Sequence, residues 1–125
     1  MSRTIRNQVE MQSVPVKMYR ALDMLTLAAP MPGLGPEDIR VELTRDGRLI
    51  LAGDLRGALK DLKEILTDEW SAGPYYREIQ LPLAVDGERA TVTYGNGVLV
   101  VALPLAKETR PAQLRIAPEA TSPAA

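Results

Sequence analysis

The side chains that most often do chemistry near neutral pH are histidine and cysteine, and this chain of 125 residues contains neither. Without histidine it lacks the commonest general base and metal ligand, so a Ser-His-Asp arrangement is impossible. Without cysteine it has no thiol nucleophile, thiolate metal site or disulfide framework. Catalysis would therefore have to come from paired carboxylates, from lysine, or from a metal held by oxygen ligands.

The remaining candidates for chemistry read better as turns. Glu37 and Asp38 are adjacent, but neighbours on a strand point to opposite faces, and after Pro36 an acidic pair favours capping a turn. The acidic turns "DGRL" and "VDGE" lack the ligand spacing of a calcium loop. Asn96 and Gly97 lie in "GNG", which has no following helix or lysine and matches a type I′ hairpin turn better than a phosphate loop. We therefore expect no enzyme, no cofactor and no metal.

Charge and hydropathy also limit the partners. The net charge is −1, which favours neither nucleic acid nor an anionic membrane surface. Trp70, Tyr75 and Tyr76 stand in an acidic stretch, so we expect them to pack against protein and not to stack on bases. There is no apolar run of membrane-spanning length, and the first residues lack the apolar stretch of a secretory signal. The expected location is the cytoplasm.

The elements that would position any site are short strands. Apolar residues alternate with polar ones within residues 14–30 and 39–43, further short runs rich in apolar or β-branched residues follow at 49–51, 75–82 and 91–103, and Gly, Pro, Asn or Asp turns separate the runs. About seven or eight such strands predict a single all-β domain built as a two-sheet sandwich. We place a short arm at residues 1–13, the domain at 14–106 and a flexible tail at 107–125.

Residues 55–70 fit two structures. Four leucines have the spacing of one helical face: Leu55, Leu59, Leu62 and Leu66. The last part, "ILTDEW" at residues 65–70, also fits a short strand. The sequence leaves both open.

The tail contains "PAQLRIAP" at residues 111–118, in which Leu114 and Ile116 flank Arg115. The two prolines disfavour helix, and in an extended segment both aliphatic side chains point the same way. Two buried aliphatic side chains contribute a few kcal/mol before the cost of ordering the tail, so the pattern predicts a weak, reversible contact with an apolar groove.

Three motifs in order resemble the α-crystallin domain of small heat shock proteins. They are "APMPGLGPEDIRVEL" at residues 29–43, "YYREIQLP" at 75–82 and "NGVLVVALP" at 96–104, and the Leu-x-Ile tail fits the same family. The resemblance covers roughly residues 14–118. It implies an immunoglobulin-like sandwich that forms homodimers or larger oligomers and holds partly unfolded client proteins without ATP.

The resemblance also implies where the contacts lie. Leu114 and Ile116 would dock in a groove on a neighbouring subunit, lined by Ile39, Val41, Leu43, Val92 and Tyr94. A strand from the long loop at residues 54–74 would cross to the partner subunit. The dimer interface would contain Arg77, Ile65, Leu66 and Trp70.

Other interpretations stay open on the sequence alone. The tail could fold onto its own domain, and Arg77 could make a cross-strand pair within one chain. The short arm of residues 1–13 also favours a different function, a scaffold or co-chaperone adaptor that binds one folded partner.

Overall fold

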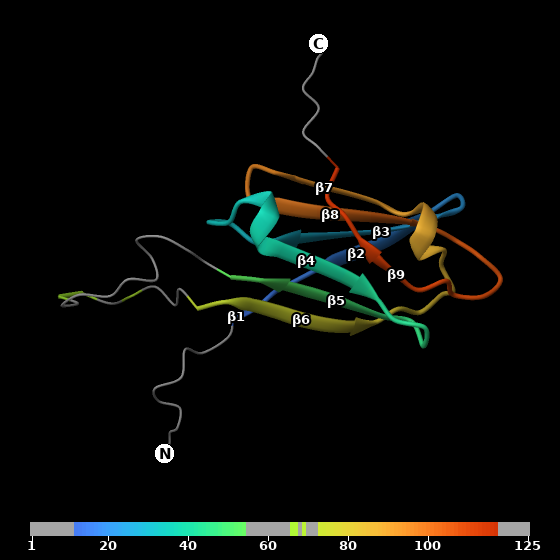
Figure 1. Cartoon of the computed structure of the whole chain (residues 1–125), viewed down its shortest axis with the longest axis horizontal. Helices are drawn as coiled ribbons and strands as arrows, with labels where there is room; N and C mark the ends of the chain where they lie inside the picture. Colours follow the sequence, from blue (N-terminus) through green and yellow to red (C-terminus); the bar gives the residue numbers. More distant parts are fainter. Residues whose placement is uncertain (1–11, 55–65, 68, 70–72, 118–125) are drawn as a thin grey trace, which may run out of the picture.

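The structure is a computed structural model that describes residues 12–54, 66–67, 69 and 73–117. The described part is all-β, with two short 3-10 turns and no α-helix. Its strands form a sheet of five in the order β1-β6-β5-β4-β9 and a sheet of four in the order β2-β3-β8-β7. The two sheets stack face to face (Figure 1). The predicted two-sheet β-sandwich is therefore confirmed.

The five-stranded sheet comprises β1 (Gln12–Ser13), β6 (Tyr75–Gln80), β5 (Arg48–Gly53), β4 (Ile39–Leu43) and β9 (Ala112–Leu114). Its strands pair antiparallel, except that β1 runs parallel to β6. Along β4 buried and exposed side chains alternate strictly, as expected when one face packs on a core and the other meets water. This alternation fixes the register, because a slip by one residue would turn every apolar side chain outward.

The four-stranded sheet comprises β2 (Lys17–Ala21), β3 (Met24–Pro30), β8 (Val98–Pro104) and β7 (Thr91–Gly95), all antiparallel. The short turns η1 (Pro36–Asp38) and η3 (Gly87–Arg89) lead into β4 and β7. Asn96 and Gly97 join β7 to β8 with φ of 53° and 78°, the left-handed conformations of a tight hairpin.

The core lies between the sheets and is aliphatic. Among its fully buried side chains are Leu27, Leu49, Leu51, Leu99 and Leu103. The chain has no phenylalanine. A tyrosine closes one end: Tyr75 is buried, and its hydroxyl donates to the Pro32 carbonyl at 2.8 Å.

In the part of the chain that the structure describes, no helix is long and apolar enough to cross a membrane. Both elements at the ends of the five-stranded sheet lie outside the strands that the sequence predicts. Strand β1 falls within the arm predicted at residues 1–13, and β9 falls within the tail predicted at 107–125. Both strands have only two or three residues, so their pairing with β6 and β4 defines them as strands.

Candidate tail-docking groove

The groove is built where β4 and β7 bring the two sheets together at one side of the sandwich. Strand β4 supplies Ile39, Val41 and Leu43, which point inward because they occupy alternate positions. Strand β7 supplies Val92 and Tyr94 from its own inward positions. These are the five residues predicted for the groove: the first four are buried, and Tyr94 is half-buried.

The segment that covers this groove is the chain's own tail. Strand β9 pairs antiparallel with β4 and places Leu114 opposite Val41. Ile116 forms a bridge with Val92, and the Ala117 amide donates to the Val92 carbonyl at 2.7 Å. The tail therefore touches one strand of each sheet, and Figure 1 shows β9 in red between β4 and β7.

The side chains of the tail follow the predicted alternation. Leu114 and Ile116 are half-buried and pack against the core, whereas Gln113 and Arg115 are exposed. Sequence reasoning expected this contact on a neighbouring subunit and left docking on the same domain as the alternative. The structure has the tail on its own domain. Docking between subunits stays a prediction.

A backbone anchor that the sequence analysis missed directs the tail toward β4. The Gly87 amide donates to the Arg110 carbonyl at 2.8 Å, and the Arg110 amide donates to the Val85 carbonyl at 3.0 Å. A Cβ on Gly87 would lie 2.6 Å from that same Arg110 carbonyl oxygen, so glycine allows the close approach. Asp86 caps η3, because its Oδ1 accepts from the Glu88 amide at 3.0 Å. "VDGE" is thus a tail anchor as well as a turn, and only the fold shows this second role.

Arg77 does not pair with a carboxylate in the described part of the chain. Its Nη1 donates to the Val14 carbonyl at 2.7 Å, and Val14 is fully buried. Close by, the Gln12 amide donates to the Pro74 carbonyl at 2.7 Å. Arg77 therefore fastens the segment of β1 and Val14, which we call the strap, along β6.

The other predicted dimer-interface residues are not assembled in the structure. Leu66 is 84% exposed. Ile65 and Trp70 lie outside the described residues, and so does the question whether residues 65–70 form a strand or a helix. The role of these residues and of Arg77 at a subunit interface stays a prediction.

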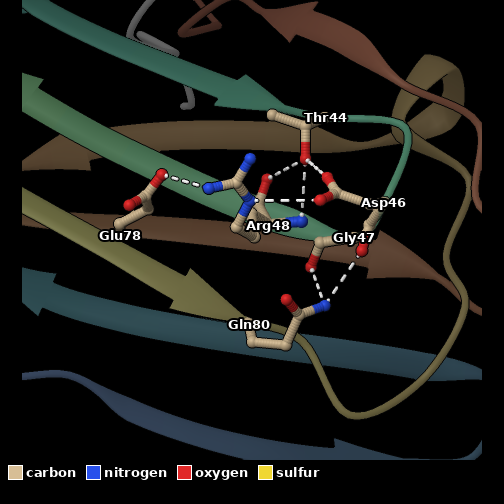
Figure 2. A network of polar contacts seen from close by, with 6 residues as sticks. All are labelled: Thr44, Asp46, Gly47, Arg48, Glu78 and Gln80. Atoms are coloured by element: carbon tan, nitrogen blue, oxygen red, sulfur yellow. Dashed lines mark hydrogen bonds and ion pairs between the residues drawn. The ribbon is translucent and has the colours of Figure 1, made fainter.

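A polar network fixes the turn that joins β4 to β5, directly after Leu43 at the end of β4 (Figure 2). Arg48 pairs with Asp46 at 3.3 Å and reaches Glu78 on β6 at 2.9 Å, and Gln80 donates to the Asp46 carbonyl at 2.9 Å. The hydrogen bond from the Thr44 hydroxyl, helped by the charge of Arg48, lowers the pKa of Asp46 below its ordinary value. The network is exposed, so it positions the turn more than it stabilises the fold.

Of the adjacent acidic residues of η1, Asp38 serves local structure. The Asp38 carboxylate accepts from the Gly35 amide at 2.9 Å, which closes the turn that begins at Pro36. Across the described ranges, no three acidic side chains come together as a metal site would require. What the structure shows at this place is a set of apolar side chains on β4 and β7 and a tail segment that packs against them.

Comparison with known proteins agrees with this description. The model of the Hsp20/alpha crystallin family matches residues 19–117, and the chain belongs to that family. A probable 15 kDa heat shock protein of Leptospira interrogans is 31% identical over 105 residues, which cover 83% of this chain and 78% of that protein. The resemblance to small heat shock proteins is thus confirmed.

Solved structures show the same fold. Heat shock protein 16.0 from Schizosaccharomyces pombe superposes with a TM-score of 0.67 at 23% identity, covering 85% of this chain and 76% of that one. A small heat shock protein from Xylella fastidiosa, reported to have a distinct high order structure, gives a TM-score of 0.67 at 24% identity and covers 86% and 99% of the two chains.

Proposed function

We propose that this protein is an ATP-independent holdase, which binds partly unfolded proteins and keeps them from aggregating. The observation that carries the proposal is the apolar groove between β4 and β7, covered by a tail that two half-buried side chains hold in place. Membership of a heat shock family supports it. The mechanism needs no covalent step, because hiding exposed apolar segments from one another is enough to slow their association.

In this proposal the tail exchanges between its own groove and the groove of another subunit. Each contact is weak, since two partly buried aliphatic side chains are worth a few kcal/mol less the cost of ordering the tail. Repeated over a homodimer or larger oligomer, such contacts become effective through local concentration. Undocking uncovers the groove, and the apolar segment of a client can then take the place of Leu114 and Ile116. We place this activity in the cytoplasm.

The test of the proposal is aggregation of a heat-labile client, followed by light scattering without nucleotide. Wild-type protein should reduce the scattering. If the scattering is unchanged at a several-fold excess of this protein, the proposal is overturned. Capture from heated and unheated lysate adds a second criterion. A broad set of proteins bound only after heating supports a holdase, whereas one partner bound equally in both supports the adaptor.

A further inference from the structure

The outward face of the four-stranded sheet carries almost no charge. The registers place Tyr19, Thr26, Ala102 and Thr91 in one row across this sheet, with neighbouring rows above and below. We call this surface the neutral face. Its outward residues are Lys17, Tyr19, Ala21, Met24, Thr26, Ala28, Pro30, Val98, Val100, Ala102, Pro104, Thr91, Thr93 and Gly95. Lys17, at the edge, is the one charged residue among them.

The neutral face also exposes large apolar side chains. Tyr19 is 51% exposed, and Met24 and Val98 are 37% exposed. The outward face of the other sheet differs sharply, because it carries Arg40, Glu42, Arg48 and Glu78. Charged residues make up 25% of the chain, so ordinary water-facing strands should carry several. The contrast within one molecule indicates that the neutral face meets something other than water.

The size of the face limits what can bind it. Four strands spaced about 4.8 Å apart, with five to seven residues rising about 3.3 Å each, span roughly 400 Å². A stable interface between folded proteins needs about 800 Å² from each partner. A second copy of this chain would bury about half of that, and its outward Thr26, Ala28 and Ala102 would meet equally small side chains.

A partly unfolded chain suits the same surface better. Its apolar segments bring large side chains, which can fill the shallow space above the small residues, and they bring no charges that would need partners. Binding such a segment on a charged face would strip water from ions without compensation. On the neutral face this penalty is absent, and a patch of this size is enough for a weak contact.

We infer that the neutral face is a docking surface for apolar segments of partly unfolded polypeptides, separate from the tail-docking groove. The inference rests on the proposed holdase function and adds a second place where clients bind. The tail contacts β4 and β7 at one side of the sandwich, whereas the neutral face is the outward surface of the four-stranded sheet. Docking or undocking of the tail therefore leaves the neutral face accessible.

The test measures binding of full-length protein to reduced and carboxymethylated α-lactalbumin, a chain that cannot refold, by fluorescence anisotropy of the labelled probe. Val100→Lys puts a charge at the centre of the neutral face and should weaken binding about tenfold. Thr93→Lys adds a charge to the same face at an exposed position of β7. This position should tolerate lysine, so the variant tests the inference even if Val100→Lys disturbs folding. The probe is acidic, so added positive charge cannot weaken binding through long-range repulsion.

The matched control is Ile50→Lys, an aliphatic-to-lysine change on the outward side of β5. There the new charge lies between Glu42 and Glu78, and binding should change by no more than about twofold. If the wild type binds the probe and both Val100→Lys and Thr93→Lys bind it equally well, the inference is overturned and the holdase proposal stands. An equal loss in Ile50→Lys would also overturn it. Failure of the wild type to bind the probe would instead count against the proposed function.

Discussion

The docked tail makes a quantitative prediction for Leu114→Ala/Ile116→Ala. Each side chain is half-buried against the core, so truncation removes about half of the 1.5–3 kcal/mol that full burial contributes. The pair together should lose about 1.5–3 kcal/mol, which shifts the docking equilibrium roughly 10- to 150-fold toward the open tail. Because the open fraction cannot exceed one, the observable change is smaller than the largest of these shifts, and we expect it to be about tenfold.

The rate of limited trypsin digestion measures this docking equilibrium, because the Arg115–Ile116 bond lies inside the docked segment. Arg110 gives no competing cut because it is followed by Pro111, and a cut after Lys107 gives a fragment of a different mass. Cleavage of a transiently opened segment follows the open population when opening is fast. Mass spectrometry should therefore show about tenfold faster cleavage at Arg115 in the double variant.

Gln113→Ala is the matched control, because Gln113 lies in the same strand with an exposed side chain. It should leave the cleavage rate at the wild-type value. Equal rates for wild type and the double variant would refute the reasoning that these two side chains hold the tail. Docking on the same domain predicts protection that is independent of protein concentration, whereas docking between subunits predicts protection that grows with concentration.

Three further predictions concern the parts that position the groove. Arg77→Ala removes the charged donor to the Val14 carbonyl and should lower the free energy of unfolding by about 1.5–3 kcal/mol in urea titrations, with faster amide exchange at Gln12; an unchanged urea midpoint would show that Arg77 does not hold the strap. Gly87→Ala forces a Cβ against the Arg110 carbonyl and should cost about 1–3 kcal/mol and speed cleavage at Arg115, whereas wild-type stability and cleavage would mean that the anchor is dispensable. Burial raises the pKa of Tyr75, so its stabilising effect is present below the pKa of the unfolded chain, about 10, and is lost as pH rises through the folded value. Tyr75→Phe should therefore be about 1 kcal/mol less stable than wild type near pH 7, and this gap should shrink in thermal melts as pH rises past about 10; a constant gap would contradict the role given to burial.

The parts of the fold that sequence could predict are those with strict local alternation. The spacing of Ile39, Val41 and Leu43 predicts a half-buried strand, and "GNG" predicts the turn that follows β7. Because the core strands show this pattern, the sandwich follows from it. The motif Leu-x-Ile also predicts that two side chains of the tail point the same way, as they do.

The parts that could not be predicted depend on distant partners. Gln12 and Ser13 become a strand only because Arg77 and Pro74 hold them along β6. Gly87 looks like an ordinary turn glycine until Arg110 lies against it. The path from Leu105 to Pro111 leads the tail to β4 of its own domain, and no local pattern encodes this path.

The neutral face could be predicted only in part, because its residues are known from the sequence but their arrangement on one surface depends on the strand register. Val100, Ala102 and Thr26 stand far apart in the sequence, and their alternation with buried neighbours predicts outward side chains. That they join into one uncharged surface follows from the pairing of β3 with β8. The sequence alone predicted an apolar groove for the tail and gave no sign of this face.

The central claim, that this protein holds partly unfolded clients without nucleotide, is tested most directly by isolating the complex. A heat-labile client is warmed with a several-fold excess of the full-length protein, cooled, and separated by size exclusion with light-scattering mass measurement. We expect the client to elute in a soluble complex with this protein, at a mass above either component. Recovery of the client in the pellet, with this protein eluting alone, would contradict it.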